Sequence, residues 1–420
     1  MNRLVTLSLV AIVLVLLDLY IFQSVRYVFQ QFSPATKRVV TIIYWLISLV
    51  ALGSFFYYNL ADKAGMSRDL RTILFSVIFV NYASKFFGVL VLVVDDVVRA
   101  GEWVWTKVRP SGSSEGNLAN AGGADISRSD FLVKTSLVAT ALPALGMTYG
   151  IVSGAHDYRV RRVSVPLKNL PSSFDGIRIA QLSDIHSGSF FNKTAVQGGV
   201  DMLLAEQPDI VFFTGDLVNN RADEINDYFS IFGRVKAPLG VYSTLGNHDY
   251  GDYVAWPSPQ AKQANLARVK AAHSEMGWNL LLDEHRILRE GNGKLAVIGI
   301  ENWGAGRFAK YGNLEKAYQG TDEADVKLLL SHDPSHWDAQ VRPSYPDIDI
   351  AFAGHTHGMQ FGIEVGSFRW SPVQYMYKQW AGLYQEGDQH LYVNRGYGYL
   401  AFPGRIGILP EVTIMELTKA

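Results

Sequence analysis

The chain has 420 residues, a formal net charge of −1 at pH 7 and no cysteine. This length exceeds that of one typical domain, so we expect two or more parts. The near-neutral charge argues against a nucleic-acid binder, which presents a basic face to phosphates. Because cysteine is absent, disulfides and thiolate sites are excluded. Any bound metal must therefore take oxygen or imidazole ligands, a donor set that suits Mn, Fe or Zn.

Four apolar runs lie within the first 155 residues, at 4–22, 39–61, 72–94 and 135–155. Each is about 20 residues long, enough to cross a hydrocarbon core of about 30 Å as a helix. Buried core helices are the alternative, but four such runs in the first third of the chain argue against it. We predict a membrane domain at 1–155 in a multi-pass protein of the inner or plasma membrane.

Two ionisable residues interrupt these runs. Asp18 lies in the first run and Lys85 in the third, at similar depths if the two helices run in the same direction. Ionisable groups inside a membrane segment are costly and usually find partners. We predict an ion pair between these two helices. The alternative is that each group snorkels to the interface or faces a wet crevice.

The segment 110–126 is rich in Gly, Ser, Asn and Ala and predicts a flexible loop. The run that follows opens with SRSDFLVK at 127–134, which resembles a twin-arginine export signal with the second arginine replaced. Lys and Arg are nearly balanced between the two sides of the membrane, so the positive-inside rule gives no clear orientation. The signal-like start favours an extracytoplasmic catalytic domain.

From 156 to 420, short strand-like runs alternate with helical segments. Continuous apolar runs such as 210–214 imply strands buried on both faces, as in an α/β fold whose sheet is covered by helices. The predicted strands are 176–182, 210–214, 240–244, 295–300, 326–330, 348–353 and 391–394, and the predicted helices include 193–206 and 259–276.

Five short polar clusters each follow an apolar run of this second part. Side chains at strand ends are held by a rigid scaffold and can converge on one cleft. A single Gly-Asp or His after a strand occurs by chance, but five in order do not. Carboxylate, amide and imidazole groups are the ligands that a two-metal site requires. The clusters are Asp184-Ile185-His186, Gly215-Asp216, Gly246-Asn247-His248-Asp249, His332 and Gly354-His355-Thr356-His357.

The order and chemistry of these clusters resemble the calcineurin-like metallophosphoesterases. The match continues through the run SHDP at 331–334 and is similar to the membrane-associated branch, whose members carry export signals or anchors. This resemblance implies a four-layer α/β/β/α sandwich at 156–420, preceded by a bundle of about four transmembrane helices. It also implies two divalent metal ions, with manganese, iron and zinc as the options.

The resemblance assigns a role to each cluster. A bridging carboxylate is physically reasonable because two divalent cations about 3.5–4 Å apart repel each other, and a hydroxide held between them can attack phosphorus. One ion would be held by Asp184, His186 and His357, the other by Asn247, His332 and His355, and Asp216 would bridge the two.

Two further residues are expected to take part in catalysis. His248 matches the catalytic histidine of the family, which stabilises the transition state and protonates the leaving oxygen. Asp249 is expected to orient the ring of His248. One departure is Asn219, because many relatives carry a second aspartate at this position.

Aromatic side chains flank two of the clusters, in 361–384 and at Tyr250, Tyr253 and Trp256. They predict a lid, an apolar substrate groove or a contact with the membrane interface, and ordinary hairpin packing is the alternative. Arg395 and Arg405 are candidate phosphate ligands, with a structural role as the alternative.

The sequence therefore predicts a membrane-anchored phosphoesterase that acts on a phosphodiester, phosphomonoester or pyrophosphate. Its partners would be this phosphate ester, with a lipid or cell-envelope substrate among the options, and the lipid bilayer. Two alternatives remain. One is a catalytically silent metal-binding module for recognition or sensing. The other is a cytoplasmic-facing pyrophosphohydrolase of nucleotide-linked lipids.

Overall fold

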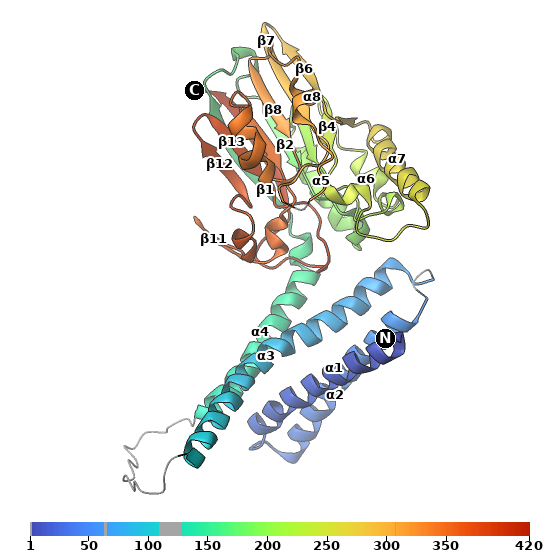
Figure 1. Ribbon diagram of the computed structural model, residues 1–420, viewed down its shortest axis with the longest axis vertical. Coiled ribbons are helices and arrows are strands. Elements are labelled where there is room, and N and C mark those ends of the chain that lie inside the picture. Colours follow the sequence, from blue (N-terminus) through green and yellow to red (C-terminus); the bar gives the residue numbers. More distant parts are fainter. Residues whose placement is uncertain (1, 63–64, 109–127, 307) are drawn as a thin grey trace, which may run out of the picture. The chain divides into compact units, whose positions relative to one another are not determined.

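The computed structural model describes residues 2–62, 65–108, 128–306 and 308–420. The chain forms two compact units that divide between Thr148 and Tyr149 (Figure 1). The flexible loop predicted at 110–126 lies outside the described residues, as does Ser127 at the start of the signal-like run.

Long apolar helices form the first unit. Among the described residues, four helices are long and apolar enough to cross a membrane, which confirms the predicted number. Asn2 caps the first helix, because its side chain accepts a hydrogen bond from the Leu4 amide, and Ser33 caps the second by accepting one from the Thr36 amide. The helices are α1 Arg3–Val28, α2 Pro34–Leu60, α3 Arg68–Val108 and α4 Arg128–Val152.

Helix α3 is much longer than the apolar run that predicts it. The run ends at residue 94, whereas the helix continues for 14 more residues to Val108. Charged residues form helices as readily as many apolar ones, so the end of an apolar run limits a membrane span and not the helix itself. Arg99 lies one turn after Asp95, and its Nε lies 3.1 Å from the carboxylate, which supports this extension.

The predicted ion pair between Asp18 and Lys85 is confirmed. Lys85 Nζ lies 2.5 Å from Asp18 Oδ1, and both side chains are buried among α1, α2 and α3. Ser48 donates a hydrogen bond to the same carboxylate oxygen at 3.0 Å, and Tyr82 approaches the other oxygen at 3.4 Å. The ammonium also lies 4.6 Å from the ring centre of Tyr44. Each charge is therefore satisfied inside the helix bundle.

We expect Asp18→Lys and Lys85→Asp each to lower the melting temperature of the full chain in detergent. Removing one partner of a buried ion pair typically costs about 3–5 kcal/mol, because the other charge is left uncompensated. The double exchange restores the attraction, so it is expected to melt above both single variants. A double variant that melts no higher than the singles would show that the pair does not stabilise the bundle.

In the described part of the second unit, the strands form two six-stranded mixed sheets and one hairpin. The first sheet has the order β1 Arg159–Leu167, β14 Glu411–Lys419, β2 Arg178–Leu182, β3 Ile210–Thr214, β4 Val241–Thr244 and β5 Asn279–Leu280. The second has the order β12 Gly382–Glu386, β13 Gln389–Val393, β9 Ile350–Ala353, β8 Val326–Leu330, β7 Gly293–Gly299 and β6 Glu284–Glu290. The hairpin pairs β10 Ile363–Val365 with β11 Phe368–Trp370.

The two sheets pack face to face, and helices cover their outer faces. In β3, Ile210 and Phe212 point into the core between the sheets, while Val211 and Phe213 join the helix-covered core, because side chains alternate along a strand. The ring of Phe212 meets Phe352 of the second sheet, with centroids 5.0 Å apart. The helices are α5 Lys193–Ala205, α6 Phe229–Phe232 and α7 Pro259–Glu275 beside the first sheet, and α8 Leu314–Tyr318 and α9 Arg342–Ser344 near the second.

This arrangement is the predicted α/β/β/α sandwich, which is therefore confirmed. The seven predicted strands correspond to β2, β3, β4, β7, β8, β9 and β13, and the two predicted helices correspond to α5 and α7. Seven further strands were not predicted: β1, β5, β6, β10, β11, β12 and β14. Strand β1 lies at a sheet edge and mixes three arginines with its apolar residues, so its sequence lacks the continuous apolar run of a central strand.

Candidate metal centre

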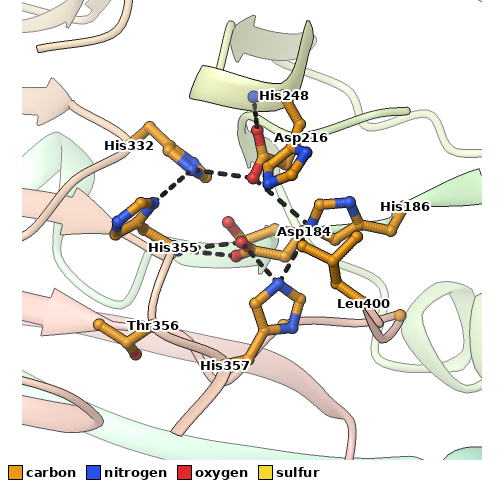
Figure 2. A network of polar contacts seen from close by, with 12 residues as sticks. Asp184, His186, Asp216, His248, His332, His355, Thr356, His357 and Leu400 are labelled. Carbon is orange, nitrogen blue, oxygen red and sulfur yellow. Dashed lines mark hydrogen bonds and ion pairs between the residues drawn. The ribbon is translucent and has the colours of Figure 1, made fainter. Parts of the chain in front are cut away.

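The polar clusters converge because parallel strands end at the same edge of each sheet. Strands β2, β3 and β4 run parallel in the first sheet, and β8 and β9 run parallel in the second. Figure 2 shows the side chains that follow these strands pointing toward one another. The seven predicted metal ligands, Asp184, His186, Asp216, Asn247, His332, His355 and His357, come together there.

Five of these ligands have a strained backbone. Their φ angles lie in the left-handed region, which costs energy for residues with a side chain. The surrounding strands must hold these conformations, and such strain concentrates at functional sites. The values are φ 52° for Asp184, 47° for His186, 61° for Asp216, 70° for His355 and 51° for His357.

The first donor group consists of Asp184, His186 and His357, whose ligand atoms lie within 4.8 Å of one another. The Nε2 atoms of the two histidines are 3.0 Å apart, and His357 Nε2 lies 3.2 Å from Asp184 Oδ1. Burial lowers the pKa of His186 well below its usual value. A neutral imidazole is the form that binds a metal ion.

The second donor group consists of Asp216, His332 and His355, and Asn247 completes it. His332 Nδ1 donates a hydrogen bond to the Thr214 carbonyl at 2.7 Å. In a neutral ring this leaves a lone pair on Nε2. That atom lies 3.1 Å from Asp216 Oδ2 and 3.2 Å from Asn247 Oδ1, so it faces two further electron-rich atoms.

Asp216 belongs to both groups. Its Oδ2 lies 3.4 Å from His186 Nε2 in the first group and 3.1 Å from His332 Nε2 in the second. Burial would lower the pKa of His332, but the Asp216 carboxylate outweighs it and raises this pKa to about 10. Burial likewise opposes ionisation of Asp216, yet the charges of His332 and His248 hold its pKa well below the usual range. The space between the groups therefore favours positive charge.

Two glycines allow the main chain to approach these ligands. A Cβ atom on Gly354 would lie 2.1 Å from Asp184 Oδ2, and one on Gly246 would lie 2.2 Å from Asp216 Oδ1. Both distances are far below van der Waals contact. Glycine is required at both positions if the two carboxylates are to stay where they are.

His248 lies beside Asp216 and His186. Its amide donates to Asp216 Oδ1 at 2.8 Å (Figure 2), and its ring centre lies 5.0 Å from that of His186. Its Nδ1 donates to the carbonyl of Asn219 at 2.8 Å, which fixes the ring and leaves Nε2 available. The side chain of Asn219 bonds Ser189 instead of a candidate metal ligand.

The expected contact between Asp249 and the ring of His248 is corrected by the structure. Both Asp249 oxygens accept main-chain hydrogen bonds: Oδ2 from Asp216 and Gly246 at 2.9 Å each, and Oδ1 from Leu217 at 2.9 Å and Val218 at 3.2 Å. The short helix at 247–250 turns this side chain toward the loop after β3. Asp249 therefore positions the Asp216 loop, and the carbonyl of Asn219 positions His248.

Two tyrosines contact the ligands in ways that the sequence did not reveal. Asn247 Nδ2 donates to the Tyr253 hydroxyl at 2.8 Å, which turns the amide oxygen toward the histidines. The Tyr377 hydroxyl lies 2.8 Å from His355 Nε2. Both tyrosines belong to the aromatic segments beside the clusters, so the sequence indicated their vicinity but not their hydroxyl contacts.

Neither arginine proposed as a phosphate ligand is available for that role. Arg405 is fully buried and donates to several main-chain carbonyls, including that of Gly398 at 2.6 Å. Arg395 is also buried and pairs with Glu411 and Glu364, both at 2.6 Å. The structural alternative is the correct one for both.

The donor set fits two divalent cations. Carboxylate, amide and imidazole groups converge in two sets at ligand spacing, and His332 Nε2 points at both Asp216 Oδ2 and Asn247 Oδ1, at 3.1 and 3.2 Å. Burial and the Asp216 charge also raise the pKa of Asp249 to about 7, which reflects the crowding of negative charge. The sandwich and these two groups thus describe a candidate dinuclear metal protein.

Comparisons with known proteins agree with this class. The family described as "Calcineurin-like phosphoesterase" matches residues 177–359, and the one described as "Probable Calcineurin-like phosphoesterase, transmembrane domain" matches residues 2–155. The "Transmembrane protein with metallophosphoesterase domain" of Danio rerio is 30% identical over 68% of this chain and 63% of its own length. The chain belongs to the calcineurin-like metallophosphoesterases with a transmembrane domain, as the resemblance predicted.

Two bacterial proteins are also similar. The "Uncharacterized metallophosphoesterase YkuE" of Bacillus subtilis (strain 168) is 27% identical over 67% of this chain and 93% of its own length. The "Phosphodiesterase YaeI" of Escherichia coli (strain K12) is 25% identical over 57% of this chain and 82% of its own length. The chain spans less than two thirds of the length of the Danio rerio protein.

We expect Asp249→Asn to lower the melting temperature of the metal-stripped chain. The amide nitrogen would face main-chain N–H groups, and each buried donor left unsatisfied costs about 1–3 kcal/mol. Asp209→Asn is the matched control, because among the described residues the Asp209 carboxylate accepts a hydrogen bond from one main-chain amide, that of Arg178. Equal melting of the two variants would contradict the positioning role of Asp249.

Proposed function

We propose that residues 156–420 form a dinuclear metal-dependent phosphoesterase and that residues 1–155 anchor it in a membrane. The observation that carries this proposal is the position of His332 Nε2, which lies 3.1 Å from Asp216 Oδ2 and 3.2 Å from Asn247 Oδ1. A cation between these atoms would satisfy all three. The first group offers a matching site on the other side of Asp216.

We assign each proposed site residue to one of two cation sites. Asp184, His186 and His357 would hold one cation, Asn247, His332 and His355 would hold the other, and both would share Asp216. When bound, two divalent cations stabilise charge on phosphoryl oxygens and lower the pKa of a water molecule. Manganese, iron and zinc all suit this donor set.

His248 is the proposed catalytic residue of the chain. Because its Nδ1–H is engaged by the Asn219 carbonyl, its Nε2 is the atom free to meet substrate. In the protonated ring this nitrogen can donate a proton to the oxygen that leaves phosphorus. The ring of Tyr253, with its centroid 4.5 Å away, supports one side of the imidazole.

The substrate class is a phosphodiester, phosphomonoester or pyrophosphate. The name of the Escherichia coli relative favours a diester. The four candidate membrane spans support a substrate with a lipid or cell-envelope part, because they keep the site close to a bilayer.

We expect the full chain, stripped of metal and resupplied with Mn, Fe, Zn or Mg, to hydrolyse bis-p-nitrophenyl phosphate. His248→Ala should lower kcat by about 10²–10⁴-fold, the range for loss of a general acid. Asp216→Ala should bind fewer metal ions per chain and lose turnover, because both groups share this carboxylate. Turnover and metal content are measured on the same samples, with p-nitrophenyl phosphate as the monoester comparison.

His285→Ala is the matched control for His248→Ala. The Nδ1 of His285 also donates to a main-chain carbonyl, that of Ala317 at 2.9 Å, but this histidine lies on β6. The control should keep turnover near that of the unchanged chain. A chain that binds two metal ions but hydrolyses neither compound would favour a silent recognition module, and one that binds no metal would overturn the proposal.

We also propose that residues 156–420 lie outside the cytoplasm. Because the chain has no cysteine, Asn292→Cys places a single thiol in the exposed turn between β6 and β7. A membrane-impermeant maleimide should label this thiol in intact cells. Labelling only after the cells are permeabilised would contradict this orientation and favour a cytoplasmic-facing pyrophosphohydrolase.

A further inference from the structure

The hairpin β10–β11 has its polar and apolar faces reversed. Glu364 lies between Ile363 and Val365 on β10, and its carboxylate points inward to Arg395 at 2.6 Å. Ile363 and Val365 point outward and are 49% and 71% exposed. A strand at a protein surface normally turns its apolar residues inward and its polar residues to water.

The segments next to the hairpin in sequence also expose apolar side chains. Val365 is paired across the strands with Phe368, which is 60% exposed. Tyr375 and Met376, just beyond β11, are 78% and 72% exposed. We call the whole set the apolar hairpin surface: Met359, Phe361, Ile363, Val365, Phe368, Tyr375 and Met376.

A surface of this kind indicates an interaction site. Single exposed apolar residues are normal on soluble proteins, but a group of this size marks a contact with protein or lipid. The reversed hairpin adds a second argument, because its inward charges prevent the apolar side chains from turning toward the core.

The apolar hairpin surface is connected to the end of the fourth candidate membrane span. That span is Asp130–His156, and its last residues belong to the second unit. The Gly150 carbonyl accepts a hydrogen bond from Arg405 N at 3.1 Å. The next residue, Ile406, donates to the Gln360 carbonyl at 2.7 Å and accepts from Gly362 N at 2.9 Å. One short segment thus joins the end of the span to the base of the hairpin.

We infer that the apolar hairpin surface inserts into the interface of the same bilayer that the fourth span crosses. Bilayer lipid is favoured over a protein partner because the surface is continuous, through 405–406, with a segment of membrane-spanning length and composition. Aromatic and aliphatic side chains at the end of a span commonly occupy the headgroup region.

The insertion bears on the candidate metal centre. Met376 belongs to the apolar hairpin surface, and the next residue, Tyr377, places its hydroxyl 2.8 Å from His355 Nε2. His357 lies only two residues before Met359, the first member of the surface. Contact with the bilayer would therefore bring the metal centre near the level of phosphate headgroups. This consequence rests on the proposed function, whereas the insertion itself does not.

The test uses the full chain in nanodiscs of phosphatidylcholine and phosphatidylglycerol. Val365→Cys introduces the only thiol, which is labelled with an NBD fluorophore. Interfacial segments bury their side chains about 5–10 Å deep, at the boundary between headgroups and acyl chains. Lipids brominated on the upper acyl chain should therefore quench this fluorophore and leave its emission blue-shifted relative to water.

Asn292→Cys is the control, since its turn lies between β6 and β7, at the end of the second unit away from β11 (Figure 1). It should show neither quenching nor a blue shift. Met376→Cys gives a second, independent position on the surface and should behave like Val365→Cys. The melting temperature of each labelled chain, matched to that of the unlabelled chain, confirms folding without any reference to activity.

Two results would overturn the inference. Blue-shifted emission without quenching by brominated lipid would show that protein, such as a second copy of the chain, covers the surface. Emission as in water at both positions would show that the surface stays exposed. Failure of the phosphoesterase proposal would appear separately, as absent turnover on bis-p-nitrophenyl phosphate with quenching intact.

Discussion

The architecture of the site depends on one carboxylate that two groups of histidines share. Asp216 Oδ2 faces His186 on one side and His332 on the other, at 3.4 and 3.1 Å. Because His332 comes from the second sheet, this contact requires the strand ends of both sheets to meet. The core between the sheets, with Phe212 against Phe352, holds that alignment, and the four main-chain hydrogen bonds to Asp249 hold the Asp216 loop.

Much of this could be predicted from the sequence because its signals are local. Continuous apolar runs such as 210–214 predict buried strands, and the polar clusters mark where those strands end. The contacts of Asp249 could not be predicted in this way. Because Asp249 is next to His248 in sequence, a contact between them was expected, but in the short helix at 247–250 the two side chains point in different directions. The hydroxyl of Tyr377 and the carbonyl of Asn219 likewise depend on tertiary structure.

In the membrane domain, by contrast, a tertiary contact could be predicted from the sequence with one physical argument. A charged side chain inside a membrane span usually requires a partner. Asp18 and Lys85 are the only charged residues inside the predicted apolar runs, and they lie at similar depths. The structure adds what depth could not indicate, namely that Ser48 of α2 bonds both groups, at 3.0 Å from Asp18 and 2.9 Å from Lys85. The pair thus links three helices and not two.

The reversed hairpin follows from a network of charges that begins far from it in sequence. Glu411 on β14 pairs with Arg395, and the same guanidinium pairs with Glu364 on β10. If the hairpin turned over, Glu364 would leave Arg395 with one carboxylate and would replace a buried ion pair with Ile363 and Val365. Since a buried charge that loses a partner is costly, the outward position of the apolar residues is imposed by the interior of the sandwich. The charge network Glu411–Arg395–Glu364 therefore fixes which face of the hairpin is exposed.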